Sequence, residues 1–307
     1  MALKHAVTAT GTDDNTKQVS VTAWNDAHTI DSNGLDFPTG TLPAAPAANN
    51  TRVFAKNLGG RIMPAFMGPS GLDATLQPHI ARNGILQYTL TFNAVTIVSN
   101  GGPAPTATGT ATAANYATTS LHTRCKRLDY LVTTAATTAV AGYRVATAFF
   151  RTTEGFHFIN RFCPATGTAT ATRRCFVGMQ ASVAAPTDVQ PSTLLNMVGV
   201  GYDAADTNFQ VFTNAGTGTA SKTDTGIARP TADRADIYSC MIFARPGGTT
   251  VGVTLIRESD GVRFDTSLTA NLPTATTALT PNCYSSVGGT SSVIGLTTFG
   301  LYVETDN

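Results

Sequence analysis

The amino-acid sequence predicts a mainly β protein, in which an extended N-terminal region precedes an antiparallel β-sandwich. Three observations carry this prediction. The 307 residues include 16 Asp but 3 Glu and 15 Arg but 5 Lys, whereas exposed helix faces are usually built with Glu and Lys. They also include 53 Thr, a β-branched residue that favours pleated strands. Finally, short apolar or alternating runs recur, each bounded by Gly, Pro, Asn or Asp.

These runs are the predicted strands. Their shortness and regular spacing are typical of an antiparallel sandwich or barrel, and not of a sheet with crossover helices. In chain order the runs are 86–98, 128–133, 143–150, 156–162, 174–183, 197–202, 209–212, 237–244, 251–257, 262–268 and 293–303.

One hairpin and one helix can be predicted locally. Asp260 and Gly261 form a favoured tight-turn pair between two strand-like runs, so we expect a β-hairpin there. The best helix candidate is the short segment 187–195, with Asp188 or Gln190 in its cap region and Pro191 in its first turn.

The composition changes near residue 84. Residues 1–83 contain the only Trp and a Pro/Ala stretch at 43–50, which has no hydrophobic face and is typical of an extended linker. From residue 85 the strand pattern is continuous, so we expect an N-terminal region at 1–83 and a β-sandwich at 84–307.

The heptapeptide ATGTATA occurs twice, at 107–113 and 165–171. Because Thr and Ala are so abundant in this chain, a chance match is favoured over a duplicated unit. We expect both copies to lie in loops or exposed edge strands, where extended Thr residues at period two share one face.

The charge content excludes several classes of partner. Only 13% of the residues are charged and the net charge is +1 at pH 7, so no long-range field attracts a polyanion and we expect no nucleic-acid partner. No stretch approaches the roughly 18 consecutive apolar residues of a membrane-spanning helix. Residues 1–5 do not begin an apolar signal-peptide core, so we expect neither membrane insertion nor Sec export.

The five cysteines predict reduced thiols. Their number is odd and no CxxC pair occurs, which argues against a zinc ribbon or a thioredoxin-like site. We expect buried, reduced side chains in a protein made in a reducing cytoplasm. The residues are Cys125, Cys163, Cys175, Cys240 and Cys283.

Catalytic motifs are missing from the sequence. It has no GxSxG, HExxH, P-loop or EF-hand pattern, so we expect no enzymatic activity and no cofactor. His157 lies between Phe156 and Phe158, where strand alternation places it on the opposite face. An exposed or satisfied strand histidine is favoured there over a catalytic base.

The acidic segment 202–208 admits three interpretations. Asp203 and Asp206, with Asn208 beyond them, could bind Ca²⁺ through oxygen ligands or, together with Asp224, serve as a glycosidase pair. A polar turn between two strands is the favoured interpretation, and we expect no metal. A sugar cleft usually offers aromatic platforms, and residues 85–307 lack Trp. Four tyrosines remain candidate platforms, although burial in the sandwich is the commoner role: Tyr202, Tyr238, Tyr284 and Tyr302.

Two parts of the chain resemble structural proteins of tailed bacteriophages. Residues 21–30 contain Trp24, Asn25 and His28 in the order W-N-x-x-H, which resembles an element near the start of many phage tail proteins. Segments 50–61 and 67–78 are similar to an N-terminal region shared by tail fibre and receptor-binding proteins. Further along, segments 176–179, 198–210 and 216–224 and the residues from Tyr238 onward resemble a β-sandwich module of phage tail proteins.

The resemblance implies a role for each region. Proteins of this kind are made in the bacterial cytoplasm and are commonly trimers, whose N-terminal segment docks on the virion while a β-domain faces outward. The sandwich would then be of jelly-roll or lectin-like type. The expected attachment residues are Trp24, His28, Phe37, Phe54 and Phe66.

The leading hypothesis is a non-enzymatic virion protein in the phage tail, either a short tail fibre or a receptor-binding protein. Its partners would be copies of itself, other tail or virion proteins, and a host-surface glycan or protein. A head decoration or baseplate adaptor that binds only virion proteins is the main alternative. A glycan depolymerase with Asp203, Asp206 or Asp224 as acid and nucleophile is a remote third.

Overall fold

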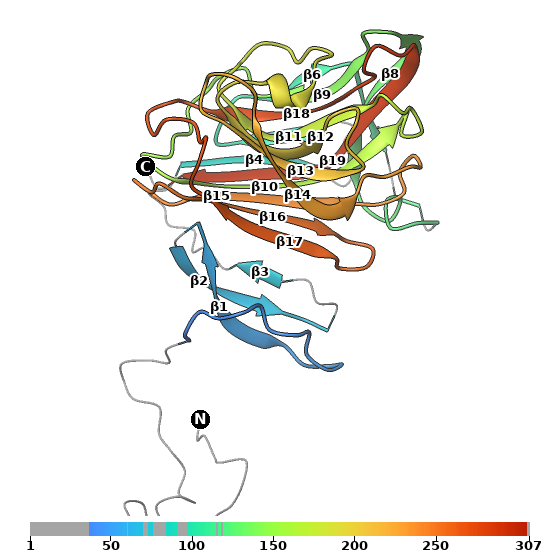
Figure 1. The fold of residues 1–307 in the computed structure, drawn as a ribbon. Helices are drawn as coiled ribbons and strands as arrows, with labels where there is room; N and C mark the ends of the chain where they lie inside the picture. Colours follow the sequence, from blue (N-terminus) through green and yellow to red (C-terminus); the bar gives the residue numbers. More distant parts are fainter. Residues whose placement is uncertain are drawn as a thin grey trace, which may run out of the picture. The chain divides into compact units, whose positions relative to one another are not determined.

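The computed structural model describes residues 37–59, 61–69, 73–75, 84–90, 97–114, 116–117 and 119–305. The chain divides into two units, residues 1–41 and 42–307, and the second contains all the named strands (Figure 1). The strands are β1 (Arg52–Leu58), β2 (Arg61–Met67), β3 (Asp73–Thr75), β4 (Gly84–Leu90), β5 (Ile97–Asn100), β6 (Thr106–Thr108), β7 (Thr110–Ala114), β8 (Arg127–Ala136), β9 (Val140–Arg144), β10 (Phe156–Thr166), β11 (Arg174–Gln180), β12 (Met197–Tyr202), β13 (Asn208–Asn214), β14 (Ser221–Ala228), β15 (Tyr238–Ala244), β16 (Val251–Arg257), β17 (Arg263–Leu268), β18 (Thr280–Ser286) and β19 (Ser292–Thr305).

Two large sheets form the sandwich. The seven-stranded sheet has the order β14-β13-β12-β11-β18-β9-β6. The nine-stranded sheet has the order β17-β16-β15-β10-β19-β4-β5, and β8 pairs with both β19 and β7 beside it. Neighbouring strands run antiparallel in both sheets. The predicted mainly β fold and its antiparallel sandwich are therefore confirmed.

Most of the predicted runs are strands, but two differ, and the predicted runs missed β14 and β18 of the sandwich and β1, β2 and β3 before it. Run 86–98 is divided between β4 and β5, and run 143–150 leaves the sheet after Arg144. Of the missed strands, β18 contains Pro281, a residue usually confined to sheet edges. The Pro281 carbonyl accepts a hydrogen bond from Val145 N at 3.0 Å, so the proline nitrogen faces the same side of β18. On that side β9 has already ended at Arg144. No ladder bond is lost there.

The hydrophobic core between the two sheets is rich in aromatic rings. Phe209 packs against Tyr238 with ring centroids 4.7 Å apart and against Tyr202 at 5.2 Å. Each of these rings is buried, and full burial of such a side chain stabilises the fold by about 2–3 kcal/mol. Tyr202 and Tyr238 are thus core residues between the sheets, whereas Tyr284 is buried in a separate cluster with Phe176 and Phe212, so none of the three is an exposed platform.

All five cysteines are free thiols, and four of them are buried. Cys125 is only half-buried. Burial raises the pKa of Cys163 and Cys283 to about 12 and that of Cys175 to about 11. These thiols are therefore protonated and unreactive at neutral pH, as the sequence predicts for structural cysteines.

The predicted hairpin is present and the predicted helix is not. β16 and β17 pair around Asp260 and Gly261, which has a φ of +72°. Segment 187–195 is a loop whose regular part is one 3-10 turn, η1 (Pro191–Thr193). The helix prediction is wrong because groups outside the segment bind its backbone: Arg174 Nη1 donates to Asp188 O at 2.9 Å, and Ser192 N donates to Asp203 Oδ1 at 3.0 Å. The bonds within the segment, such as those from Thr193 N to Gln190 O and from Leu194 N to Pro191 O, close only short turns.

The two ATGTATA copies adopt different structures. In the first copy, Gly109 has a φ of +80° and joins β6 of the seven-stranded sheet to β7, which pairs with β8. In the second, β10 ends at Thr166 and Gly167, with a φ of +71°, opens the turn to β11. Identical sequences thus form an edge strand once and a turn once, which supports the chance-match interpretation.

Strands β1, β2 and β3 form a separate three-stranded sheet in that order. On one face Met63, Ala65 and Met67 are buried, and Met63 packs against Phe243 of β15. The division predicted at residue 83 stays a prediction, because this sheet is separate from both large sheets yet belongs to the same unit as the sandwich.

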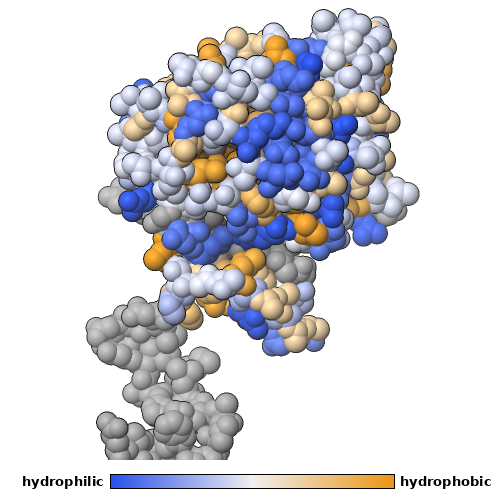
Figure 2. Space-filling model, viewed as in Figure 1, coloured by the Kyte–Doolittle hydropathy of each residue, from blue (hydrophilic) through white to orange (hydrophobic). Residues whose placement is uncertain are grey.

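Apolar residues on the visible face of the molecule lie in small patches among polar ones (Figure 2). Within the part of the chain that the structure describes, no helix is long and apolar enough to cross a membrane.

Candidate functional site

A groove crosses the outer face of the nine-stranded sheet where β19 changes its neighbour. β19 pairs with β8 up to Thr298 and with β4 from Leu301. The register with β10 also shifts at this point, so Phe299 has no partner in any of the three strands. Such bulges redirect a side chain and are frequent near functional sites. The groove has a volume of about 290 Å³, and its walls are Gln87, Tyr88, Thr89, Lys126, Ile159, Arg161, Phe299, Gly300, Leu301 and Tyr302.

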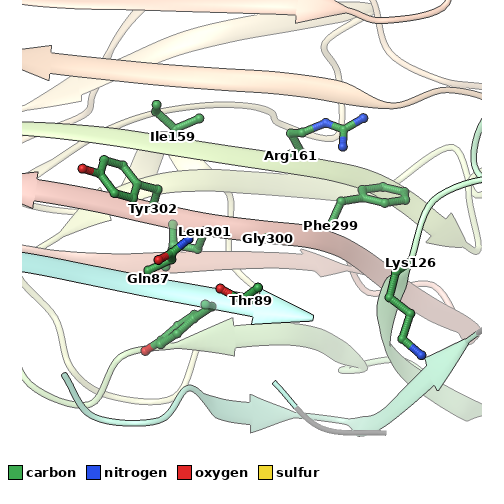
Figure 3. Close-up of a pocket in the computed structure, with 10 residues that line it drawn as sticks. Gln87, Thr89, Lys126, Ile159, Arg161, Phe299, Gly300, Leu301 and Tyr302 are labelled. Carbon is green, nitrogen blue, oxygen red and sulfur yellow. The ribbon is translucent and has the colours of Figure 1, made fainter. Parts of the chain in front are cut away.

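Aromatic and polar side chains share this groove (Figure 3). Gln87 and Thr89 lie exposed on β4, while Phe299 and Tyr302 lie half-buried on β19. The guanidinium carbon of Arg161 is 5.5 Å from the centroid of the Phe299 ring, a cation–π contact that orients both side chains. The groove therefore offers ring faces beside amide and hydroxyl groups.

Phe299 is also supported from below by a histidine. The His122 ring is edge-on to Phe299, with centroids 5.5 Å apart, and its Nε2 lies 3.3 Å from Thr297 Oγ1. His122 is only 1% exposed. Burial, aided by the nearby charge of Arg127, lowers the pKa of His122 to about 4, so this ring is neutral at physiological pH.

Arg161 is held over Phe299 by a carboxylate. Its Nε donates to Glu258 Oε1 at 2.7 Å and its Nη2 to Glu258 Oε2 at 2.5 Å, while Ser239 Oγ also donates to Oε1 at 2.6 Å. Burial would raise the pKa of Glu258, but these hydrogen bonds outweigh it and the pKa is lowered. The pair is bidentate, the geometry that fixes a guanidinium most firmly.

Replacing Glu258 with Gln should lower the free energy of unfolding at pH 7 by about 1 kcal/mol, because one charge-assisted bond is lost in a partly exposed pair. Since the folded-state pKa of Glu258 is depressed, its contribution is present above about pH 4.5 and lost below it. Urea unfolding at pH 7 and pH 3.5 measures both effects. The control is Asp260→Asn, because the Asp260 side chain is 44% exposed in its ion pair with Arg257. This substitution should change stability by less than about 0.5 kcal/mol. Equal losses in the two variants would contradict this role for Glu258.

The predicted attachment residues are distributed over the N-terminal part. Trp24 and His28 lie outside the described residues. Phe37 is 47% exposed, Phe66 on β2 is 39% exposed, and Phe54 on β1 is half-buried. The structure brings Phe54 and Phe66 into one hairpin but places them on opposite faces, because Phe54 pairs with the buried Ala65 whereas Val53 pairs with Phe66.

The outward face of the β1–β2 hairpin is apolar. Val53 and Phe66 are direct cross-strand neighbours, and Ile62 lies on the same face, with exposures of 52%, 39% and 61%. Three large apolar side chains this exposed on one small sheet are unusual unless another surface covers them.

The three candidate Ca²⁺ ligands, Asp203, Asp206 and Asn208, do not surround a common empty space. The ammonium group of Lys222 lies 3.1 Å from Asp203 Oδ2 and 2.5 Å from Asp206 Oδ1. Asn208 instead donates to both carboxylate oxygens of Asp224, at 3.0 and 3.2 Å. Asp203 also accepts Ser192 N, and Asp206 accepts Asp203 N. This arrangement is a polar turn closed by a lysine, the favoured interpretation of the segment.

The same geometry bears on the depolymerase hypothesis. A general acid needs a raised pKa, but the amide of Gly226 and the side chain of Asn208 lower the pKa of Asp224. Among the residues that the structure describes, no group of three His, Cys, Asp or Glu side chains could hold a metal ion. His157 is buried, and its ring packs against that of Phe243 with centroids 5.6 Å apart.

Sequence reasoning identified one groove residue, Tyr302, and missed the others. Phe299 stands in an ordinary strand run, and Arg161 is one of 15 arginines. Their convergence depends on a bulge and on a change of strand partner, and neither has a local sequence signal. The one available sequence signal for the groove was Phe299, an apolar residue that breaks the strand alternation just before Gly300.

Comparisons with known proteins find structural similarity only. No family model and no curated protein matches the sequence. A protein of unknown function from Shewanella oneidensis is 14% identical, with 75% of this chain and 90% of that chain covered and a TM-score of 0.47. The lectin UEA-II complexed with galactose is 12% identical, with 73% and 98% covered and a TM-score of 0.47.

A carbohydrate esterase of the Shiga toxin-encoding bacteriophage phi24B is 13% identical, with 72% of this chain and 98% of that chain covered and a TM-score of 0.42. Because all three TM-scores are below 0.5, the assignment of the antiparallel β-sandwich rests on the strand order and registers of this chain.

Proposed function

We propose that this chain is a non-enzymatic structural protein of a tailed-bacteriophage virion, either a short tail fibre or a receptor-binding protein, which binds a host-surface glycan. The observation that carries the proposal is the groove across β4, β10 and β19, where Phe299 and Tyr302 lie beside Gln87, Thr89 and Lys126. The resemblance of segments 21–30, 50–61 and 67–78 to phage tail proteins supplies the virion context.

The chemistry of the groove suits a carbohydrate. Sugar rings present C–H faces that pack on aromatic rings, and their hydroxyl groups exchange hydrogen bonds with amides, hydroxyls and ammonium groups. Ligand sites typically have mainly apolar walls with a small number of precisely placed polar groups. The groove is also shallow and lies on a sheet face, so it can receive one unit within a longer polymer.

The N-terminal sheet supports the attachment role. The exposed Val53, Ile62 and Phe66 form an uncharged face on the β1–β2 hairpin, which suits contact with another protein. In this proposal residues 1–83 dock on the virion and the sandwich faces the host, and three copies assemble into one fibre.

The first test is direct binding of the full-length protein to cells. Fluorescently labelled protein is incubated with a panel of bacterial strains, and its mass in solution is measured by light scattering. The expected result is a trimer that coats at least one strain and competes with phage for adsorption. Protein that leaves every strain dark would overturn the receptor-binding role.

Replacing Phe299 with Ala should reduce cell binding at least tenfold, because loss of one aromatic platform typically costs about 1.5 kcal/mol or more of binding free energy. Titration of labelled protein on the strain that it coats measures the change. Tyr116→Ala removes an aromatic side chain that is 50% exposed outside the groove and should bind as the wild type does. If both variants bind normally, the ligand lies elsewhere.

The main alternative is an adaptor or head decoration protein that binds only virion proteins. The apolar hairpin face favours it, since that surface suits a protein partner better than a glycan. Protein that is incorporated into particles but neither coats cells nor competes with phage would establish this role instead.

A further inference from the structure

One side of the sandwich ends in a segment that belongs to both large sheets. β6 pairs with β9 at the edge of the seven-stranded sheet, and β7 pairs with β8 at an edge of the nine-stranded sheet. Gly109 joins the two strands, so residues 106–114 form one edge segment, here called the Thr/Ala edge. In the part of the chain that the structure describes, the backbone of this segment is hydrogen-bonded only in these two ladders. Its other side is therefore open to a further strand.

The side chains of the Thr/Ala edge are small and uncharged. The segment consists of Thr, Ala and one Gly, without any charged residue or proline, and most of it is exposed. The end of β8 beside it continues into residues 133–138, which are also Thr and Ala throughout and are all exposed. An exposed sheet edge without charge or proline is a ready template for pairing with another strand.

The other outer strands of the two large sheets are protected against such pairing. β14 carries Lys222 and Asp224, and its register with β13 shifts. β17 carries Arg263 and Asp265, and Lys56 Nζ of β1 lies 3.3 Å from Asp265 Oδ1. β5 has four residues, whereas the Thr/Ala edge spans nine. Charges, irregular register and short length are the usual protections of an edge, so their scarcity at the Thr/Ala edge indicates a surface that pairs.

We propose that the Thr/Ala edge binds a second copy of this chain through the same edge, so that β7 of each copy pairs antiparallel with β7 of the other. Two identical uncharged edges meet without the repulsion that opposed like charges cause. The side chains also match. With Ala111 of one copy opposite Ala111 of the other, Thr110 lies opposite Thr112, and opposed Thr side chains stabilise a strand pair.

This register preserves the layers of the sandwich. Ala111 pairs with Tyr130, which is buried in the core, so Ala111 lies on the core-facing side of its sheet. Because directly opposed residues point to the same face, the core-facing side of one sheet continues into that of the other. The two nine-stranded sheets then form one continuous sheet across a two-fold axis, a contact that closes after two copies.

The inference goes beyond the proposed function and can fail without it. Pairing at the Thr/Ala edge doubles whichever assembly the rest of the chain forms. A single copy would become a dimer, and a trimer would become a hexamer with three such contacts. The groove shares no residue with this edge, so cell binding tests the proposed function separately.

The first test measures the mass of the full-length protein by sedimentation equilibrium over a range of concentrations. One strand pair forms few hydrogen bonds, each with a modest net contribution, so the mass should rise with concentration to twice that of Ala111→Lys. This substitution places two ammonium groups opposite each other and should raise the dissociation constant at least tenfold. The matched control is Ala228→Lys, because Ala228 is exposed on the edge strand β14. It should keep the wild-type mass.

The second test uses the symmetry of the contact. Ala111→Glu should also remain unpaired by itself, whereas an equal mixture of Ala111→Lys and Ala111→Glu should recover the doubled mass, because position 111 of one copy meets position 111 of the other. This recovery also shows that both variants are folded. Equal masses for the wild type and Ala111→Lys, or a mixture that stays unpaired, would overturn the proposal. A wild-type trimer that Ala111→Lys converts into single copies would also overturn same-edge pairing, while leaving the proposed trimer intact.

Discussion

Replacing Arg173 with Ala is expected to lower the free energy of unfolding by about 4 kcal/mol. Arg173 is 1% exposed and joins both sheets. Its Nη1 donates to Thr166 O at 3.0 Å and Thr168 Oγ1 at 2.6 Å, and its Nη2 donates to Gly295 O at 2.9 Å and Ser285 Oγ at 3.2 Å. Alanine would leave these acceptors buried without donors and open a cavity at the end of the sandwich.

Urea unfolding followed by intrinsic fluorescence measures this loss. Arg173→Lys should fall between the wild type and Arg173→Ala, because an ammonium group keeps the charge but cannot span acceptors on β10, β18 and β19 at once. The control is Arg151→Ala, since Arg151 is 43% exposed and its Glu154 contact is 3.8 Å long. Its expected effect is below about 0.5 kcal/mol. A loss under 1 kcal/mol for Arg173→Ala would refute the role of this residue as a link between the sheets.

Acidification from pH 7.5 to pH 5 is expected to cost about 2 kcal/mol of stability through His122 alone. The folded protein holds the pKa of His122 at about 4, whereas the model value is 6.5. Between these values the unfolded chain binds a proton that the folded protein does not, so stability falls as pH falls. Burial is the main cause, Arg127 and Arg234 add to it, and Asp129 opposes it.

Unfolding free energies of the wild type and His122→Gln at pH 7.5, 6 and 5 measure this contribution. The wild type should lose about 2 kcal/mol more than the variant over this range. The carboxylates with lowered pKa values, such as Glu258 and Asp233, titrate below it and do not interfere. Because the folded protein keeps His122 neutral down to about pH 4, binding in the groove should stay unchanged over this range. Parallel pH curves for the two proteins would show that His122 does not carry the effect.

The groove illustrates why the candidate site could be predicted only in part. Tyr302 was a recognisable platform candidate in the sequence, whereas Phe299 was not. Phe299 is in the groove because β19 exchanges β8 for β4 beside it and because β10 shifts register. Both events depend on strands that are more than 100 residues distant in sequence, so no window around residue 299 contains them.

Two neighbouring arginines show the same limit. Arg173 points into the sandwich and becomes its buried link, whereas Arg174 binds Asp188 of the loop between β11 and β12. Strand alternation predicts that the two point to opposite sides, but not which side is buried. That choice follows from which neighbouring strands supply acceptors.

What the sequence determined by itself is local in origin. Strand preference comes from β-branched residues and from the scarcity of Glu and Lys, the β16–β17 hairpin comes from Asp260 and Gly261, and the reduced state of the thiols follows from their number and spacing. The tertiary structure alone decided the remainder: Pro281 in a central strand, two structures for one heptapeptide, a loop in place of the 187–195 helix, and the groove itself. In each case the hydrogen bonds that decide the structure join segments distant in sequence. These bonds can outweigh the local conformational preferences of the residues only once the two sheets have come together.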